Sequence, residues 1–156
     1  MLDLIEELRI EIMVILFSML PIIEVRGAIP LGISLGLSPI HSTILGIIGN
    51  IIIVPFLLKL LHPIMLFFEK TVIFSKTIGW VKKRAMKKSG TIKKYSLIGL
   101  FIFVAVPIPT TGAWTGSVIA SILKLDFKKS LLAISLGVVS SGFIVAIISY
   151  GVVSIF

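Results

Sequence analysis

Cysteine is absent from this 156-residue chain, and charged residues are scarce. The absence of cysteine excludes a disulfide framework, a thiolate nucleophile and a cysteine metal site. Charged residues make up 14% of the chain, against about 25% in an average soluble domain. Hydrophobic residues make up 57%, and the mean hydropathy is +1.17. One small core cannot hide so many apolar residues, so we expect one membrane domain with lipid around much of its surface.

The formal net charge of +8 comes from basic residues that flank the apolar runs. They concentrate in residues 69–95 and recur in the short turn 124–129. The positive-inside rule explains this pattern, so we expect 69–95 to be a cytoplasmic loop that lies on anionic lipid headgroups. We do not expect nucleic acid as a partner. The N-terminal residues are acidic, unlike the basic start of a signal peptide, and we expect no cleavage there.

Two apolar stretches, residues 20–36 and 106–121, contain residues that a spanning helix disfavours. The first reads LPIIEVRGAIPLGISLG and holds a glutamate, an arginine, two prolines and three glycines; the second reads VPIPTTGAWTGSVIAS. The apolar arms beside them are too short to cross a hydrocarbon core of about 30 Å, which needs roughly 20 residues. We therefore predict two re-entrant helical hairpins with polar tips that protein or a water-filled cavity surrounds.

The two halves of the chain follow one pattern, a hairpin and then an apolar run long enough to span (41–68 and 130–156). The predicted fold is an all-α integral membrane protein with an amphipathic N-terminal helix and two inverted repeats, residues 1–68 and 96–156. When the two halves are aligned on this pattern, Gly27-Ala28 corresponds to Gly112-Ala113. With loop 69–95 inside, the halves have opposite orientations, as in many transporters. In a rival topology, residues 12–36 form one kinked span. This topology places the acidic N-terminus in the cytoplasm and removes the inverted symmetry of the two halves.

The residues at the two hairpin tips form the candidate binding site. Glu24 and Arg26 are ionisable groups at membrane depth, where a functional role is the default hypothesis. Burial raises the pKa of a carboxylate, so Glu24 is a candidate proton site. Arg26 can hold a phosphate or a carboxylate in its planar fork. The structural alternative is that these two groups pair with each other, or with the opposite hairpin, and only hold the tips together.

The other candidates would complete the site. Helix N-termini at Gly27 and Gly112 would offer backbone N–H donors to an anion, and threonine hydroxyls would add further groups. We expect Trp114 to pack rather than contact ligand, and Asn50 to bond a hairpin carbonyl. The candidate substrate- or proton-binding residues are Glu24, Arg26, Gly27, Pro30, Asn50, Pro107, Pro109, Thr110, Thr111, Gly112, Trp114 and Thr115.

Metal and enzyme chemistry find little support in the sequence. His41 and His62 lie near the ends of a predicted span, and no carboxylate or second histidine stands at ligand spacing from them. We therefore predict no metal site and no cofactor. A nucleophile beside a base is also missing, so we expect no catalytic residues and no enzyme.

The motifs E-V-R-G-A-I-P at 24–30 and P-I-P-T-T-G-A-W-T-G at 107–116 resemble the small multidrug export protein family, a distant relative of the DedA (VTT-domain) membrane proteins. The resemblance covers nearly the whole chain. It implies two re-entrant hairpins that face each other in a small helical bundle. DedA relatives are implicated in moving lipids, including polyprenyl-phosphate carriers, between leaflets, with proton-dependent phenotypes.

In DedA proteins an acidic residue and arginines in the hairpins are the expected functional groups. Glu24 and Arg26 match this expectation in the first hairpin. The second hairpin departs from it, because it has no arginine and carries Thr110, Thr111 and Trp114 instead.

The resemblance and the residues favour a carrier that moves a lipid or polyprenyl-phosphate-type amphiphile between leaflets, with proton coupling through Glu24. The alternative is proton-coupled export of small amphiphilic drugs, for which the neighbouring Arg26 is unfavourable when the drug is a cation. A purely structural or assembly role is a third hypothesis. The expected partners are a membrane lipid or amphiphile, and a homodimer is compatible with so few helices.

Overall fold

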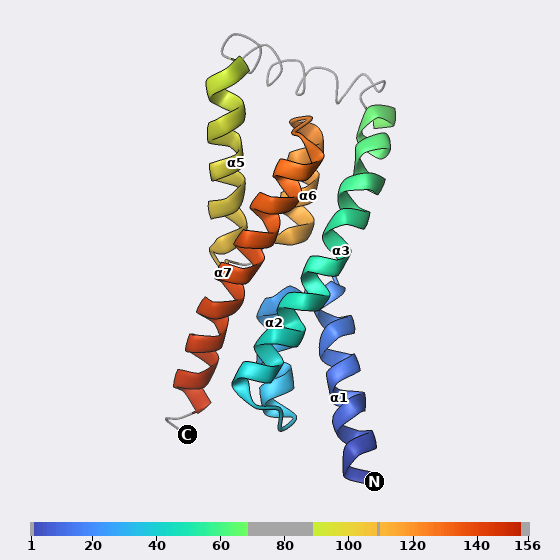
Figure 1. Ribbon diagram of the computed structural model, residues 1–156, viewed down its shortest axis with the longest axis vertical. Helices are drawn as coiled ribbons and strands as arrows, with labels where there is room; N and C mark the ends of the chain where they lie inside the picture. The colour runs from blue at the N-terminus through green and yellow to red at the C-terminus, as the bar shows by residue number, and fades with distance from the viewer. Residues whose placement is uncertain (1, 69–88, 109, 154–156) are drawn as a thin grey trace.

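The computed structural model describes residues 2–68, 89–108 and 110–153, in which all regular structure is helical (Figure 1). The predicted all-α class is therefore confirmed for these residues. Most of the predicted basic loop, residues 69–88, lies outside the described part of the chain, and the helix after it begins at Ser89 rather than at residue 96. The six helices are α1 (Leu2–Met19), α2 (Glu24–Ser34), α3 (Pro39–Phe68), α5 (Ser89–Ala105), α6 (Ala113–Ile122) and α7 (Phe127–Val153).

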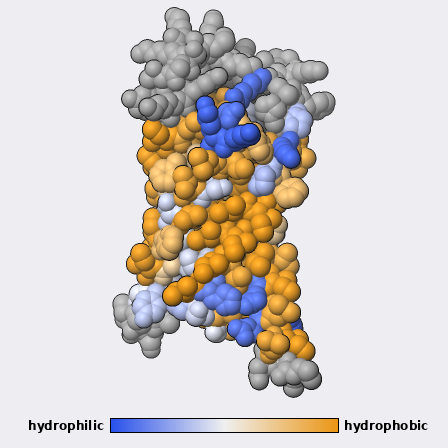
Figure 2. Space-filling model, viewed as in Figure 1, coloured by the Kyte–Doolittle hydropathy of each residue, from blue (hydrophilic) through white to orange (hydrophobic). Residues whose placement is uncertain are grey.

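Helices α3 and α7 are long and apolar enough to cross a membrane, over Pro39–Leu61 and Phe127–Gly151. They run nearly the full length of the molecule, and two shorter apolar helices, Ser96–Ala105 and α6, lie beside them (Figure 1). Apolar side chains cover the middle of the face shown in Figure 2, while hydrophilic residues gather towards its two ends. On α3 every fourth residue of one stripe is exposed and apolar: Ile44, Ile48, Ile52, Phe56 and Leu60. Such a stripe suits lipid as the surrounding solvent.

Helices α1 and α2 fold back on each other and form what we call the first hairpin. Val14 of α1 is fully buried in a cluster with Ala28 and Leu37. A Cβ atom on Gly32 of α2 would lie 2.8 Å from Val14 Cγ2, so the two helices approach very closely. The alternative of one kinked span over residues 12–36 is therefore wrong, because the chain reverses after Met19. The predicted lead-in and the apolar run after it form one continuous helix, α1.

Helices α5 and α6 form the second hairpin, and their contact is equally close. A Cβ atom on Gly116 of α6 would lie 2.7 Å from Val104 Cγ2 of α5. Helix α1 packs on α3 and α5 packs on α7, while α2 and α6 each contact both long helices. In Figure 1 the first hairpin occupies the half of the molecule that holds the chain termini, and the second hairpin occupies the other half. Their tips meet near the middle.

Two helix boundaries of the first half recur at the same offset in the second half. Helices α2 and α6 end at Ser34 and Ile122, and α3 and α7 begin at Pro39 and Phe127. Both pairs are 88 positions apart in the sequence (34 and 122, 39 and 127). The same offset relates Ala28 to Gly116, which are buried at matching positions of α2 and α6. The overlay of Ala28 on Ala113 uses a different offset of 85 positions (28 and 113), and the order of elements that it predicted is present.

A buried apolar core surrounds the place where the tips meet. It is built from both hairpins and both long helices, with Ile29 from α2, Val54 from α3, Val104 from α5 and Ile134 from α7 all nearly or fully inaccessible. Because this core draws on residues far apart in the chain, it fixes the position of each tip relative to the other.

Candidate functional site at the hairpin tips

Glu24, the first residue of α2, reaches across to the second hairpin. Its Oε1 atom accepts a hydrogen bond of 3.1 Å from the backbone N–H of Trp114, in the first turn of α6. The residue is 4% exposed. The first N–H groups of a helix have no partner within it, and the helix dipole is positive there, so this position favours an anion. The Glu24 carboxylate therefore caps α6 from the opposite hairpin.

Gly112 makes this approach feasible. It is the residue before α6, its φ is 150°, and a Cβ atom added to it would collide with the Glu24 carboxylate. Glycine tolerates such a φ and leaves the space open. The predicted helix N-terminus at Gly112 is confirmed, and the anion that it holds is the protein's own carboxylate. The predicted N-terminus at Gly27 is wrong, because α2 already begins at Glu24.

Arg26, two residues further along α2, also bonds the second hairpin. One terminal nitrogen donates to the carbonyl oxygen of Ile108, and the other donates to Thr111 Oγ1 at 2.8 Å. Its Nε atom is buried and has no hydrogen-bond partner among the described residues. The described residues also show no ion pair between Glu24 and Arg26. The predicted alternative in which these groups hold the opposite hairpin thus agrees with the geometry. The guanidinium has five N–H donors, and the hydrogen bonds to Ile108 and Thr111 use two of them.

Trp114 and the threonines hold the tips in place. The Trp114 indole N–H donates to the carbonyl oxygen of Met19, the last residue of α1, at 2.9 Å. The Thr115 hydroxyl donates to the carbonyl oxygen of Thr110 at 2.9 Å. Thr110 has a φ of 79°, which is rare for a β-branched residue and is a form of backbone strain that clusters at functional sites. Because its indole bonds Met19, Trp114 is a positioning residue that joins α6 to the end of α1.

A cavity of about 720 Å³ lies between the two tips. This volume falls within the range of small-molecule sites, roughly 300–1,000 Å³. Its walls combine apolar side chains with a few polar groups. The first hairpin contributes Pro21, Ile22, Ile23, Glu24, Arg26 and Gly27, and the second contributes Pro107, Thr110, Thr111 and Thr115.

The structure brings together most of the candidate residues but not all of them. Gly112 and Trp114 support the cavity through Glu24 without lining it, and Pro30 lies within α2 away from the lining. Asn50 is fully buried on α3, and neither amide atom has a hydrogen-bond partner among the described residues. The predicted bond from Asn50 to a hairpin carbonyl is therefore wrong. Pro109 lies outside the described residues.

Sequence reasoning missed the residues just before Glu24 and the backbone acceptors. Ile22 and Ile23 line the cavity, and Ile22 is 93% exposed. Pro21 was a signal for them, because it breaks the apolar run and forces the turn that exposes them. The carbonyl groups of Met19 and Ile108 have no such signal, since every residue carries one.

Comparison with known proteins identifies a family. The family model described as "Putative small multi-drug export protein" matches residues 24–144. This range begins at the residue that caps α6 and includes both tips and most of α7. No curated protein and no solved structure matches the chain.

Proposed function

We propose a function from the premise that this chain belongs to the small multi-drug export protein family and is an integral membrane protein. The protein is a DedA-like carrier that moves an anionic amphiphile, a lipid or polyprenyl phosphate, between leaflets. It acts by transport rather than by catalysis. The cavity between the hairpin tips holds the headgroup, and its apolar wall contacts the start of the acyl or prenyl chain.

The recurrence of elements supports an inverted repeat. Each hairpin enters and leaves the bilayer on the same side, and the hairpins enter from opposite sides. The turn from Lys124 to Lys129 lies at the end of the molecule where α3 ends and α5 begins (Figure 1). The acidic side chains of Glu6, Glu7 and Glu11 are on α1, which begins at the other end. The positive-inside rule therefore favours a cytoplasmic location for the basic end.

The position of Arg26 in the wall of the cavity is the observation that carries the proposal. A guanidinium has five N–H donors, and those beyond the two bonded to the second hairpin can donate to a phosphate or carboxylate oxygen. The two terminal guanidinium nitrogens are fixed to Ile108 and Thr111, so the group is held in place before a ligand arrives. The α6 N-terminus is already occupied by Glu24, so Arg26 rather than that helix end receives the headgroup.

Glu24 supplies the coupling to protons in this mechanism. A proton on its carboxylate removes the negative charge that the α6 N-terminus favours. The contact between the two hairpins is then weaker, and the tips can separate. Because Glu24 also lines the cavity, the protonation state and the passage of a headgroup are linked at one place.

A second candidate function is export of lipophilic cations with Glu24 as the cation site. The observation in its favour is that Glu24 is the carboxylate in a largely apolar cavity. Arg26 in the same cavity repels a cation, and a cation would also have to compete with the α6 N-terminus for the carboxylate. The charge of the substrate distinguishes the two functions.

The test is leaflet exchange in reconstituted liposomes. Labelled phosphatidic acid and a labelled polyprenyl phosphate are followed in the wild type and in Arg26→Gln. Arg9→Gln is the matched control, because Arg9 is an exposed arginine on α1 outside the cavity. We expect exchange in the wild type, at least a tenfold loss in Arg26→Gln and no change in the control.

Movement of the lipophilic cation tetraphenylphosphonium by the wild type, without exchange of either anionic lipid, would overturn the proposal. So would unchanged exchange in Arg26→Gln. Thermal unfolding in detergent establishes that each variant is folded before its transport is compared.

A further inference from the structure

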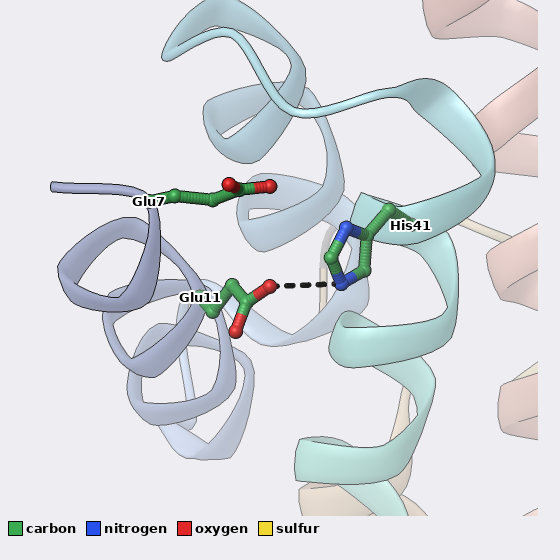
Figure 3. A group of neighbouring side chains, drawn as sticks. All are labelled: Glu7, Glu11 and His41. Atoms are coloured by element: carbon green, nitrogen blue, oxygen red, sulfur yellow. Dashed lines mark ion pairs between the residues drawn. The ribbon is translucent and has the colours of Figure 1, made fainter. Parts of the chain in front are cut away.

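A cluster of three potential metal ligands lies far from the hairpin tips, near the start of α1. Glu7 and Glu11 stand one turn apart on α1, and His41 stands in the first turn of α3 (Figure 3). The His41 ring points towards the two carboxylates, and its Nε2 atom is 3.0 Å from Glu11 Oε1. One ligand atom from each residue lies within 4.8 Å of the others. We infer that these residues form a site for a first-row divalent metal ion, represented by Zn²⁺.

The geometry suits a shared metal ion. Zn²⁺ binds histidine nitrogen and carboxylate oxygen at about 2.0–2.2 Å, so ligand atoms around one ion lie roughly 3–4 Å apart. The distance from His41 to Glu11 already falls in this range. Glu7 needs only a rotation of its exposed side chain to complete the set. No carboxylate lies near His41 in the sequence, which is why the spacing of residues predicted no metal site. The packing of α1 on α3 brings two carboxylates to His41.

The charges at this place also favour a divalent cation. Two carboxylates at positions i and i+4 of a helix repel each other and destabilise it. His41 can offer at most one positive charge to the pair. A divalent ion neutralises both carboxylates and leaves the imidazole as a neutral ligand.

The donor set selects the class of metal. Imidazole favours Zn²⁺ and its neighbours in the first row, whereas Ca²⁺ and Mg²⁺ prefer oxygen ligands alone. His41 and Glu11 are partly exposed, with 40% and 25% of their side chains accessible, so an ion can enter from solvent and keep water ligands.

Metal binding would clamp α1 to α3. The end of α1 accepts the indole N–H of Trp114, so the ion would also steady the helix that leads into the cavity. A ligand that binds only the folded state raises its stability. The site is separate from the proposed transport function and does not depend on the identity of the transported molecule.

The test is a titration of tag-free, chelator-treated protein in detergent with Zn²⁺ and, separately, with Ca²⁺. We expect one equivalent of Zn²⁺ to bind more tightly than Ca²⁺ and to raise the unfolding temperature. Glu7→Gln and His41→Ala should each weaken Zn²⁺ at least tenfold, since even changes around the ligands of a metal site cost about 10–100-fold. Glu6→Gln is the matched control, because it removes an exposed charge from the same turn of α1 outside the cluster.

Absence of Zn²⁺ binding in the folded wild type would overturn the inference. Equal affinity in Glu7→Gln and the wild type would do the same. Equal affinities for Ca²⁺ and Zn²⁺ would exclude His41 as a ligand and therefore the site as drawn. Glu7→Gln keeps the test decisive if His41→Ala fails to fold, because Glu7 is exposed and lies outside the His41–Glu11 contact.

Discussion

The two hairpins have the same arrangement of helices but contribute different chemistry to the site. The first hairpin supplies charged side chains, Glu24 and Arg26, while the second supplies backbone groups and hydroxyls. Glu24 is the first residue of α2, and Gly112 is the residue just before α6. These two residues are also in direct contact, with the carboxylate of one against the bare backbone of the other.

This difference explains why the second hairpin needs no arginine. Arg26 already spans the gap between the tips and bonds Ile108 and Thr111 on the far side. A second arginine at the Thr111 position would repel the first and would have no carboxylate within its own hairpin. A symmetrical arrangement of helices can therefore hold an asymmetrical site, and the two halves can evolve complementary rather than identical tips.

Gly112→Ala should produce the largest effect, because it attacks the point where the two tips touch. The new methyl group collides with Glu24, and the φ of 150° strains any residue but glycine. We expect a loss of about 3 kcal/mol in unfolding free energy, from strain of about 1–3 kcal/mol and the broken cap. The measurement is denaturant unfolding in detergent.

Gly36→Ala is the control for Gly112→Ala. Gly36 has a φ of 102°, and nothing lies within 4 Å of a Cβ atom added there. It should cost only the left-handed strain, about 1–2 kcal/mol. Equal losses in the two variants would contradict the contact between Gly112 and Glu24.

Glu24→Ala should lower the unfolding free energy by about 2 kcal/mol. It removes the acceptor of the Trp114 N–H and leaves a partly buried donor without a partner. Glu24→Gln should lose less, because the amide oxygen still accepts that bond. Glu6→Ala, on an exposed face of α1, should stay within about 0.5 kcal/mol of the wild type. A Gln variant as unstable as the Ala variant would show that charge, rather than the hydrogen bond, dominates this contact.

A double-mutant cycle should detect the bond between Arg26 and Thr111. We expect a coupling energy of about 1.5 kcal/mol between Arg26→Gln and Thr111→Val, because hydrogen bonds to charged groups contribute roughly 1.5–3 kcal/mol. The control cycle pairs Arg26→Gln with Ser140→Ala, whose hydroxyl bonds its own helix. If the coupling energy in the first cycle were as small as in the control cycle, the bond between Arg26 and Thr111 would not contribute to stability.

Trp114→Phe should produce the smallest effect, a loss of about 1 kcal/mol, because only the bond from the indole to Met19 is removed. Ser34→Ala serves for comparison, since its hydroxyl makes a local, exposed bond to Leu31. Thermal unfolding of both variants should rank Trp114→Phe below Ser34→Ala in stability. The reverse order would show that the indole bond does not join α6 to α1.

The sequence predicted the broken segments, the long spans and most of the residues at the tips, because proline, glycine and charge are conspicuous in apolar surroundings. It did not predict that Glu24 would bond a backbone N–H of α6, since a backbone donor is present at every position. It also placed the start of α2 at Gly27, although the helix begins at Glu24 and continues through Pro30. Proline inside a helix is tolerated at membrane depth when neighbouring groups satisfy the freed carbonyl, and sequence alone does not reveal those neighbours.

Binding of an anionic headgroup at Arg26, in the cavity between the tips, can be measured directly by tryptophan fluorescence. Trp80→Phe leaves Trp114, which supports the cavity through Glu24, as the only tryptophan of the chain. The Trp80→Phe protein is titrated with short-chain phosphatidic acid and, separately, with tetraphenylphosphonium, and the fluorescence of Trp114 is recorded. We expect a saturable fluorescence change with phosphatidic acid, whose affinity is weakened at least tenfold by Arg26→Gln and is unaltered by Arg9→Gln. A saturable change with the cation alone, or equal affinity for phosphatidic acid with and without Arg26, would contradict this expectation.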